Sequence, residues 1–71
     1  MMARTHRRER QVGHWMAARH RFRLSVAGNG IGPAVVMTGA EAHDRNQALD
    51  RAYLSGKAQR VARWEVARND P

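Results

Sequence analysis

Residues 20–27 have the sequence His-Arg-Phe-Arg-Leu-Ser-Val-Ala, and this stretch decides the fold. Every second side chain in it is apolar: Phe22, Leu24 and Val26. This alternation is typical of a β-strand with one buried face and one face in water. If the apolar side chains point inward, then Arg21 and Arg23 point outward from a rigid sheet.

A glycine-rich run follows this strand and predicts a turn. Residues 28–33, Gly-Asn-Gly-Ile-Gly-Pro, include several that accept a positive φ angle, and residues 34–38 then predict a second strand. The two strands form an antiparallel hairpin. The run lacks a following Gly-Lys-Ser/Thr and precedes a strand rather than a helix, which favours a turn over a nucleotide-binding loop.

A helix is expected after the hairpin. Residues 38–41, Thr-Gly-Ala-Glu, have the form of a capping box, in which the threonine hydroxyl accepts a hydrogen bond from the Glu41 amide and the glutamate side chain reaches back. Residues 55–56, Ser-Gly, supply a left-handed stop. The helix is therefore predicted over residues 41–54.

Two further elements complete the chain. Residues 58–68 alternate again and predict a third strand, with arginine and glutamate on one side and three apolar residues on the other: Ala62, Trp64 and Val66. Residues 6–19 carry apolar side chains at spacings of three and four, which predicts a short amphipathic helix, although Gly13 disfavours it.

These elements predict an α+β fold, a three-stranded antiparallel sheet with two helices in the order α-β-β-α-β. We expect one small domain over residues 1–71, with frayed tails at 1–5 and 69–71. The third strand is placed beside the first, and the other edge of the hairpin is the alternative. The expected core is Phe22, Leu24, Val26, Val35 or Val36, Met37, Leu49, Tyr53, Trp64 and Val66, with Trp15 and Met16 sealing one edge.

The composition excludes several classes of protein. Without cysteine there is no disulfide framework or thiolate-bound zinc, and the chain fits a reducing compartment, so a cytoplasmic location is expected. No apolar run approaches the roughly 20 residues that cross a bilayer, and we expect no membrane partner. A two-layer domain of this size has little interior for a catalytic pocket. We expect no enzyme activity, no catalytic residue, no small-molecule substrate and no cofactor.

The four histidines do not predict a metal site. They lack the paired spacing of metal ligands, and three of them lie in a region crowded with cations, which opposes binding of another. Solvated side chains are the expected state.

Arginines concentrate at the N-terminal end of the chain. Seven fall between Arg4 and Arg23, where the one acid is Glu9. Such a localised positive field attracts phosphate or an acidic protein surface. Strand alternation gathers part of it into one patch, and the predicted binding residues are Arg7, Arg8, Arg10, Arg19, Arg21, Arg23 and Arg63. The alternative is that these are solvated side chains that only keep a small protein in solution.

The order of elements resembles that of some phage-encoded anti-CRISPR proteins that inhibit type I systems. The resemblance lies in the hairpin of residues 21–38, the helix of 41–54 and the returning strand of 60–66, and it rests on no motif. It implies a stoichiometric inhibitor that binds a Cas subunit of a type I complex, blocks target DNA and acts in the host cell cytoplasm.

Two other function classes stay open. A small DNA- or RNA-binding regulatory protein would use the same arginines on phosphates, with affinity that falls steeply as salt rises. A small enzyme or toxin would need a pocket that joins a histidine and an acid, which nothing in the sequence predicts.

Overall fold

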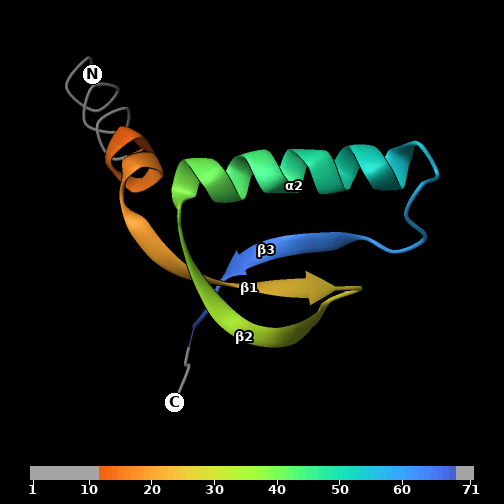
Figure 1. Cartoon of the computed structure of the whole chain (residues 1–71), viewed down its shortest axis with the longest axis horizontal. Coiled ribbons are helices and arrows are strands. Elements are labelled where there is room, and N and C mark those ends of the chain that lie inside the picture. The colour runs from red at the N-terminus through yellow and green to blue at the C-terminus, as the bar shows by residue number, and fades with distance from the viewer. Residues whose placement is uncertain (1–11, 69–71) are drawn as a thin grey trace, which may run out of the picture.

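The computed structural model describes residues 12–68, and Figure 1 shows one helix beside a twisted sheet. Residues 12–17 are helical. The elements that follow are β1 (Arg19–Val26), β2 (Asn29–Thr38), α2 (Gly39–Leu54) and β3 (Ala62–Val66). The α+β fold and the order α-β-β-α-β are confirmed. The predicted tails, and residues 6–11 of the predicted first helix, lie outside the described residues.

The sheet has the strand order β2-β1-β3, with β1 antiparallel to both neighbours. The prediction that the third strand lies beside the first is therefore confirmed. In Figure 1, β3 is the strand nearest to α2 and β2 the strand farthest from it. Because α2 packs mainly against β3, it covers only part of the sheet.

The hairpin turn is shorter than predicted. It consists of Ala27 and Gly28, with φ angles of 51° and 84°, and Val26 pairs directly with Asn29. Positive φ at both central residues is the type I′ geometry, whose twist matches that of the flanking strands. The turn predicted over residues 28–33 is therefore wrong, because the run after Gly28 pairs with β1 as part of β2.

A bulge interrupts β2. Phe22 pairs with Val35 but Leu24 pairs with Ile31, so residues 32–34 stand opposite Arg23 alone. Gly32 has a φ of 73°, which a residue with a β-carbon rarely adopts. The Arg23 Nε donates a hydrogen bond to the Gly32 carbonyl oxygen over 3.2 Å, so the arginine side chain helps to hold the bulge.

Both ends of α2 follow the predicted chemistry. The Glu41 amide donates to Thr38 Oγ1 over 3.0 Å, which confirms the cap. The Glu41 carboxylate forms an ion pair with Arg45 instead of reaching back to Thr38. At the other end Ser55 caps the helix, and Gly56 has a φ of 81°, as a left-handed stop requires.

The core is small. Its fully buried apolar residues are Phe22, Met37 and Ala42, and Trp64 packs against them while half-buried. Several residues predicted in the core are exposed instead: Val35, Val36, Tyr53 and Val66. Val35 is exposed because α2 lies along β3 and does not extend over β2, whereas Val36 pairs with Arg21 and so belongs to the face of the sheet opposite α2.

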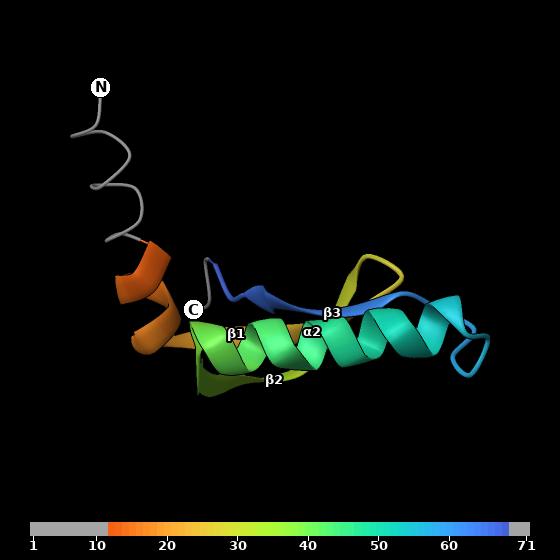
Figure 2. The same cartoon turned by 90° about the horizontal axis from the view of Figure 1, so that it is seen from above.

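The helical segment of residues 12–17 lies beyond the first turn of α2 in both views (Figures 1 and 2). The Trp15 ring stacks on His20 at a centroid distance of 4.9 Å and meets Phe22 edge-on at 6.0 Å. The Nε2 atom of His20 also lies 2.9 Å from the Trp15 carbonyl oxygen. Trp15 therefore closes one end of the core, as predicted.

Candidate functional site

Strand pairing assigns the predicted arginines to one face of the sheet. Phe22 packs on Ala42 of α2, so the neighbouring residues Arg21 and Arg23 project from the opposite face. Residues that pair directly across two strands point to the same face of the sheet. The residues of β2 and β3 that pair with these positions of β1 therefore belong to this face as well. We call this the outer face; its residues are Arg19, Arg21, Arg23, Ser25, Val36, Arg63 and Glu65.

Arg19 and Arg21 are the most accessible of these cations on β1. Both are exposed, whereas Arg23 is half-buried beneath its contacts with β2. Alternate residues of a strand are about 7 Å apart, so the three arginines form a row with fixed spacing. Arg7, Arg8 and Arg10 of the predicted patch lie outside the described residues.

Arg63 differs from the prediction. It belongs to the outer face by its pairing with Ser25, but its guanidinium donates to both oxygens of Asp50 on α2, over 3.1 and 3.3 Å. The side chains are 50% and 43% exposed. Arg63 is therefore held by an ion pair with α2 and is not a freely solvated cation of the predicted patch. Since β3 lies beside α2, the long arginine side chain reaches the helix.

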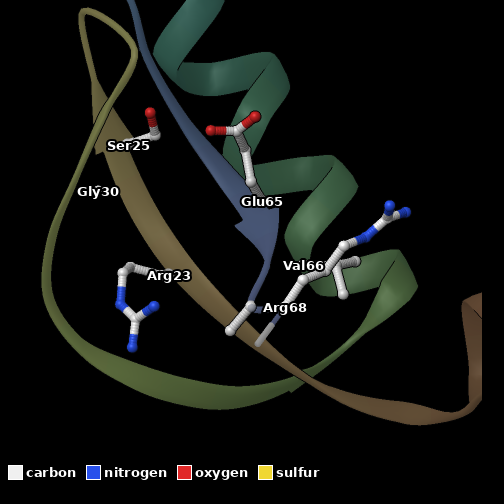
Figure 3. A pocket seen from close by; sticks show the side chains of 7 residues that line it. Arg23, Ser25, Gly30, Glu65, Val66 and Arg68 are labelled. Carbon is white, nitrogen blue, oxygen red and sulfur yellow. The ribbon is translucent and has the colours of Figure 1, made fainter. Parts of the chain in front are cut away.

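A shallow pocket of ≈ 270 Å³ lies on the outer face (Figure 3). Its lining is Arg23, Ser25, Gly30, Glu65, Val66, Ala67 and Arg68. Ser25 is 7% exposed, and the stem of Arg23 passes so close to Gly30 that a β-carbon there would lie 3.0 Å from Arg23 Cδ. In Figure 3 the Arg23 guanidinium and the Glu65 carboxylate point to opposite ends of the pocket.

The lining of this pocket carries charges of both signs, from Arg23, Arg68 and Glu65. Its lining offers Ser25 as a hydroxyl but no histidine to act as a base for it. Among residues 12–68 no group of three or more histidines and acids is placed to hold a metal ion. Charged hydrogen-bonding groups remain, and these suit a carboxylate or phosphate ligand of a larger partner.

The predicted binding residues left out two residues of this face, although the alternation had already placed Glu65 on the same side as Arg63. Arg68 follows β3 and adds a cation to the pocket, while Glu65 is paired with Arg23 and places an acid among the cations. The alternation of residues 62–66 was sufficient to find Glu65, because Glu65 is two residues after Arg63 and its side chain therefore points to the same face. Arg68 gave no comparable signal, since the strand ends at Val66.

The two layers differ in charge. The strands and the two residues after β3 carry five arginines and one acid, Glu65. In contrast, α2 carries three acids and two arginines: Glu41, Asp44, Asp50, Arg45 and Arg51. The excess positive charge of the described chain therefore lies mainly on the sheet.

Comparison with known protein families, with curated proteins and with solved structures finds no match for this chain. No helix within the described part is long and apolar enough to cross a bilayer.

Proposed function

We propose that this chain is a non-enzymatic binding protein that uses the arginines of β1 to engage an anionic partner. The observation that carries the proposal is the exposure of Arg19 and Arg21 at alternate positions of one strand, on the side of the sheet opposite α2. Their spacing is set by the backbone, so they suit a partner with anionic groups at matching positions.

The preferred partner is the acidic surface of a folded protein. A row of arginines on a sheet pays less conformational entropy on binding than a disordered basic arm, which supports a structured target. The resemblance to anti-CRISPR proteins makes a Cas subunit of a type I effector complex the first such surface to test. In that setting the chain acts as a stoichiometric inhibitor of target DNA binding, in the cytoplasm of a host cell.

Nucleic acid is the second candidate. It is favoured by the excess of arginine over acid on the strands, because arginine forms paired hydrogen bonds with phosphate. The two candidates differ in salt dependence. Binding to B-DNA would lose about 0.9 log units of affinity per log unit of salt for each phosphate neutralised.

The test compares two double variants of equal charge. Arg19→Ala with Arg21→Ala removes the exposed row, whereas Arg51→Ala with Arg60→Ala removes two exposed cations from the helix and the following loop. We expect the first variant to weaken inhibition of a type I complex at least about tenfold and the second to retain it. If such complexes bind target DNA normally in the presence of the wild-type chain, the Cas assignment is lost.

A gel shift with DNA and RNA at two salt concentrations tests the second candidate. A shift that weakens steeply with salt, and that the Arg19 and Arg21 variant abolishes, supports nucleic acid as the partner. Absence of any shift at low salt removes that candidate.

A further inference from the structure

The two edges of the sheet are treated differently. At the β3 edge, the side-chain amide of Asn46 on α2 bonds to both peptide groups of Trp64: Trp64 N donates to Asn46 Oδ1 over 2.6 Å, and Asn46 Nδ2 donates to the Trp64 carbonyl oxygen over 3.0 Å. This is the pattern that a neighbouring strand would make. Arg45 lies over the Trp64 ring, 5.6 Å from its centroid. The β3 edge is therefore closed to another strand at its centre.

The backbone hydrogen bonds of β1 also establish which peptide groups of β2 face outward. Ala27 N donates to the Val61 carbonyl, and Ala67 N donates to that of Arg21, so the odd-numbered residues of β1 bond to β3. The even-numbered residues then bond to β2, where Phe22 pairs with Val35 and His20 with Met37. Val36, which lies between these two bonded residues, directs its amide and carbonyl groups toward the outer edge, and the Thr38 amide faces the same way. The Thr38 carbonyl is not part of this edge, because Thr38 is the N-cap of α2.

The side chains of this edge are apolar and exposed. Val36 is 57% exposed, Val35 36% and Ile31 48%. No charged residue occurs between Arg23 and Glu41. Natural sheets protect an edge with charges, proline or a bulge. The bulge and Pro33 protect only the far half of β2, which leaves residues 34–38 with none of these devices.

We propose that residues 34–38 of β2 pair in antiparallel fashion with the same residues of a second copy of this chain. The two-fold axis passes beside Val36, so Val36 stands opposite its counterpart and the two sheets join into one of six strands. The inference is independent of the proposed function. It concerns the edge of the sheet, whereas the arginines project from its face.

A second copy is the occupant that the chemistry favours. The edge is uncharged and apolar, so it is complementary to itself, and the cores of homodimer interfaces are likewise more apolar than ordinary surface. Residues 12–68 bury only three apolar side chains, so this part of the chain has little core, and oligomerisation is one of the ways in which so small a domain gains stability.

The high net charge of +7 does not oppose this arrangement strongly. Arg21 pairs with Val36, so the line across the dimer runs from Arg21 through both copies of Val36 to the second Arg21. Three strand spacings separate the two arginine backbones by about 14 Å. The Debye length at physiological ionic strength is about 8 Å, so their repulsion is largely screened. The dimer would present two antiparallel arginine rows on one continuous face.

The test measures molecular mass against protein concentration by sedimentation or light scattering. The wild-type chain is expected at about twice its 8.0 kDa. Val36→Lys places two like charges opposite each other at the axis and should weaken the dimer at least about a hundredfold. Leu54→Lys is the matched control, because Leu54 is 81% exposed at the end of α2, and it should leave the mass unchanged.

Hydrogen exchange provides a readout at the edge itself. The Val36 amide should become protected as concentration rises, whereas the Met37 amide, which faces β1, should be protected at every concentration. Higher salt should preserve or tighten the dimer, although it weakens binding to an anionic partner.

A wild-type chain that stays monomeric at 0.1 mM and 0.5 M salt overturns the proposal, as does a Val36→Lys chain that dimerises like wild type. If the chain is monomeric and Val36→Lys instead abolishes capture of an extended peptide, the edge accepts a foreign strand and the proposal is again lost.

Discussion

The indole ring of Trp15 lies directly against the α-carbon of Gly39, the first residue of α2, and the Trp15 carbonyl oxygen lies 2.7 Å from the position that a β-carbon of residue 39 would take. The close approach joins the helical segment of residues 12–17 to the start of α2. It is possible only because residue 39 has no side chain.

Gly39→Ala should therefore destabilise the protein. The added methyl group collides with both the ring and the backbone of Trp15, and relief requires Trp15 to move away from Phe22. We expect a loss of about 1–3 kcal/mol in the free energy of unfolding, measured by urea denaturation. Gly13→Ala is the control. A β-carbon at Gly13 meets nothing within 4 Å, and alanine favours the helix, so this variant should gain up to about 1 kcal/mol.

Asn46→Ala should destabilise the edge of β3. The substitution removes both hydrogen bonds to Trp64 and leaves its half-buried peptide groups without these partners, at an expected loss of about 1–3 kcal/mol. Gln47→Ala, at the exposed next position, should change stability by less than about 0.5 kcal/mol. Asn46→Asp keeps the acceptor but sets a carboxylate against the Trp64 carbonyl, so it should not restore stability.

An equal loss of stability for Asn46→Ala and Gln47→Ala would show that the two hydrogen bonds between the Asn46 side chain and the Trp64 backbone make no specific contribution. Thermal unfolding followed by circular dichroism distinguishes these cases with small amounts of protein.

Ala27→Asn should stabilise the hairpin. Ala27 has a φ of 51°, which is costly for alanine, whereas asparagine followed by glycine is the preferred type I′ turn. We expect a gain of about 0.5–1 kcal/mol in the free energy of unfolding. Ala27→Val should lose stability, because a β-branched residue tolerates positive φ less well. A loss with asparagine would contradict the type I′ assignment.

Asp50→Ala should strengthen binding to polyanions. The substitution removes a negative charge and releases the Arg63 guanidinium from its ion pair. The variant should elute from a heparin column at higher salt than wild type. Asp44→Ala makes the same change of charge at an exposed position of α2 and should shift elution less.

Because the Arg63–Asp50 pair is about half-exposed, its loss should cost at most about 1 kcal/mol of stability. Equal shifts for the two variants would mean that Arg63 takes no part in binding.

Much of the fold could be predicted because it depends on local patterns. The alternation of Phe22, Leu24 and Val26 identified β1, and the hydroxyl of Thr38 and the glycine at residue 56 marked the ends of α2. The hairpin could not be resolved to the residue. Several glycines accept positive φ equally well, and the pairing of β2 with β1 selects which of them forms the turn.

The candidate site was predictable only in part. Alternation along β1 places Arg21 and Arg23 on one face, since side chains of a strand alternate whatever surrounds them. Arg19 was predicted at the end of the first helix, and it joins the row because β1 begins one residue earlier than predicted. The sequence by itself thus determined the elements, their order and two of the three cations in the row. Only the tertiary structure decided that α2 lies along β3. That placement pairs Arg63 with Asp50, closes one sheet edge with Asn46 and leaves Val35 exposed at the other. The physical reason is that backbone periodicity is local, whereas the partner of a long side chain and the cover of a strand edge depend on how distant segments pack.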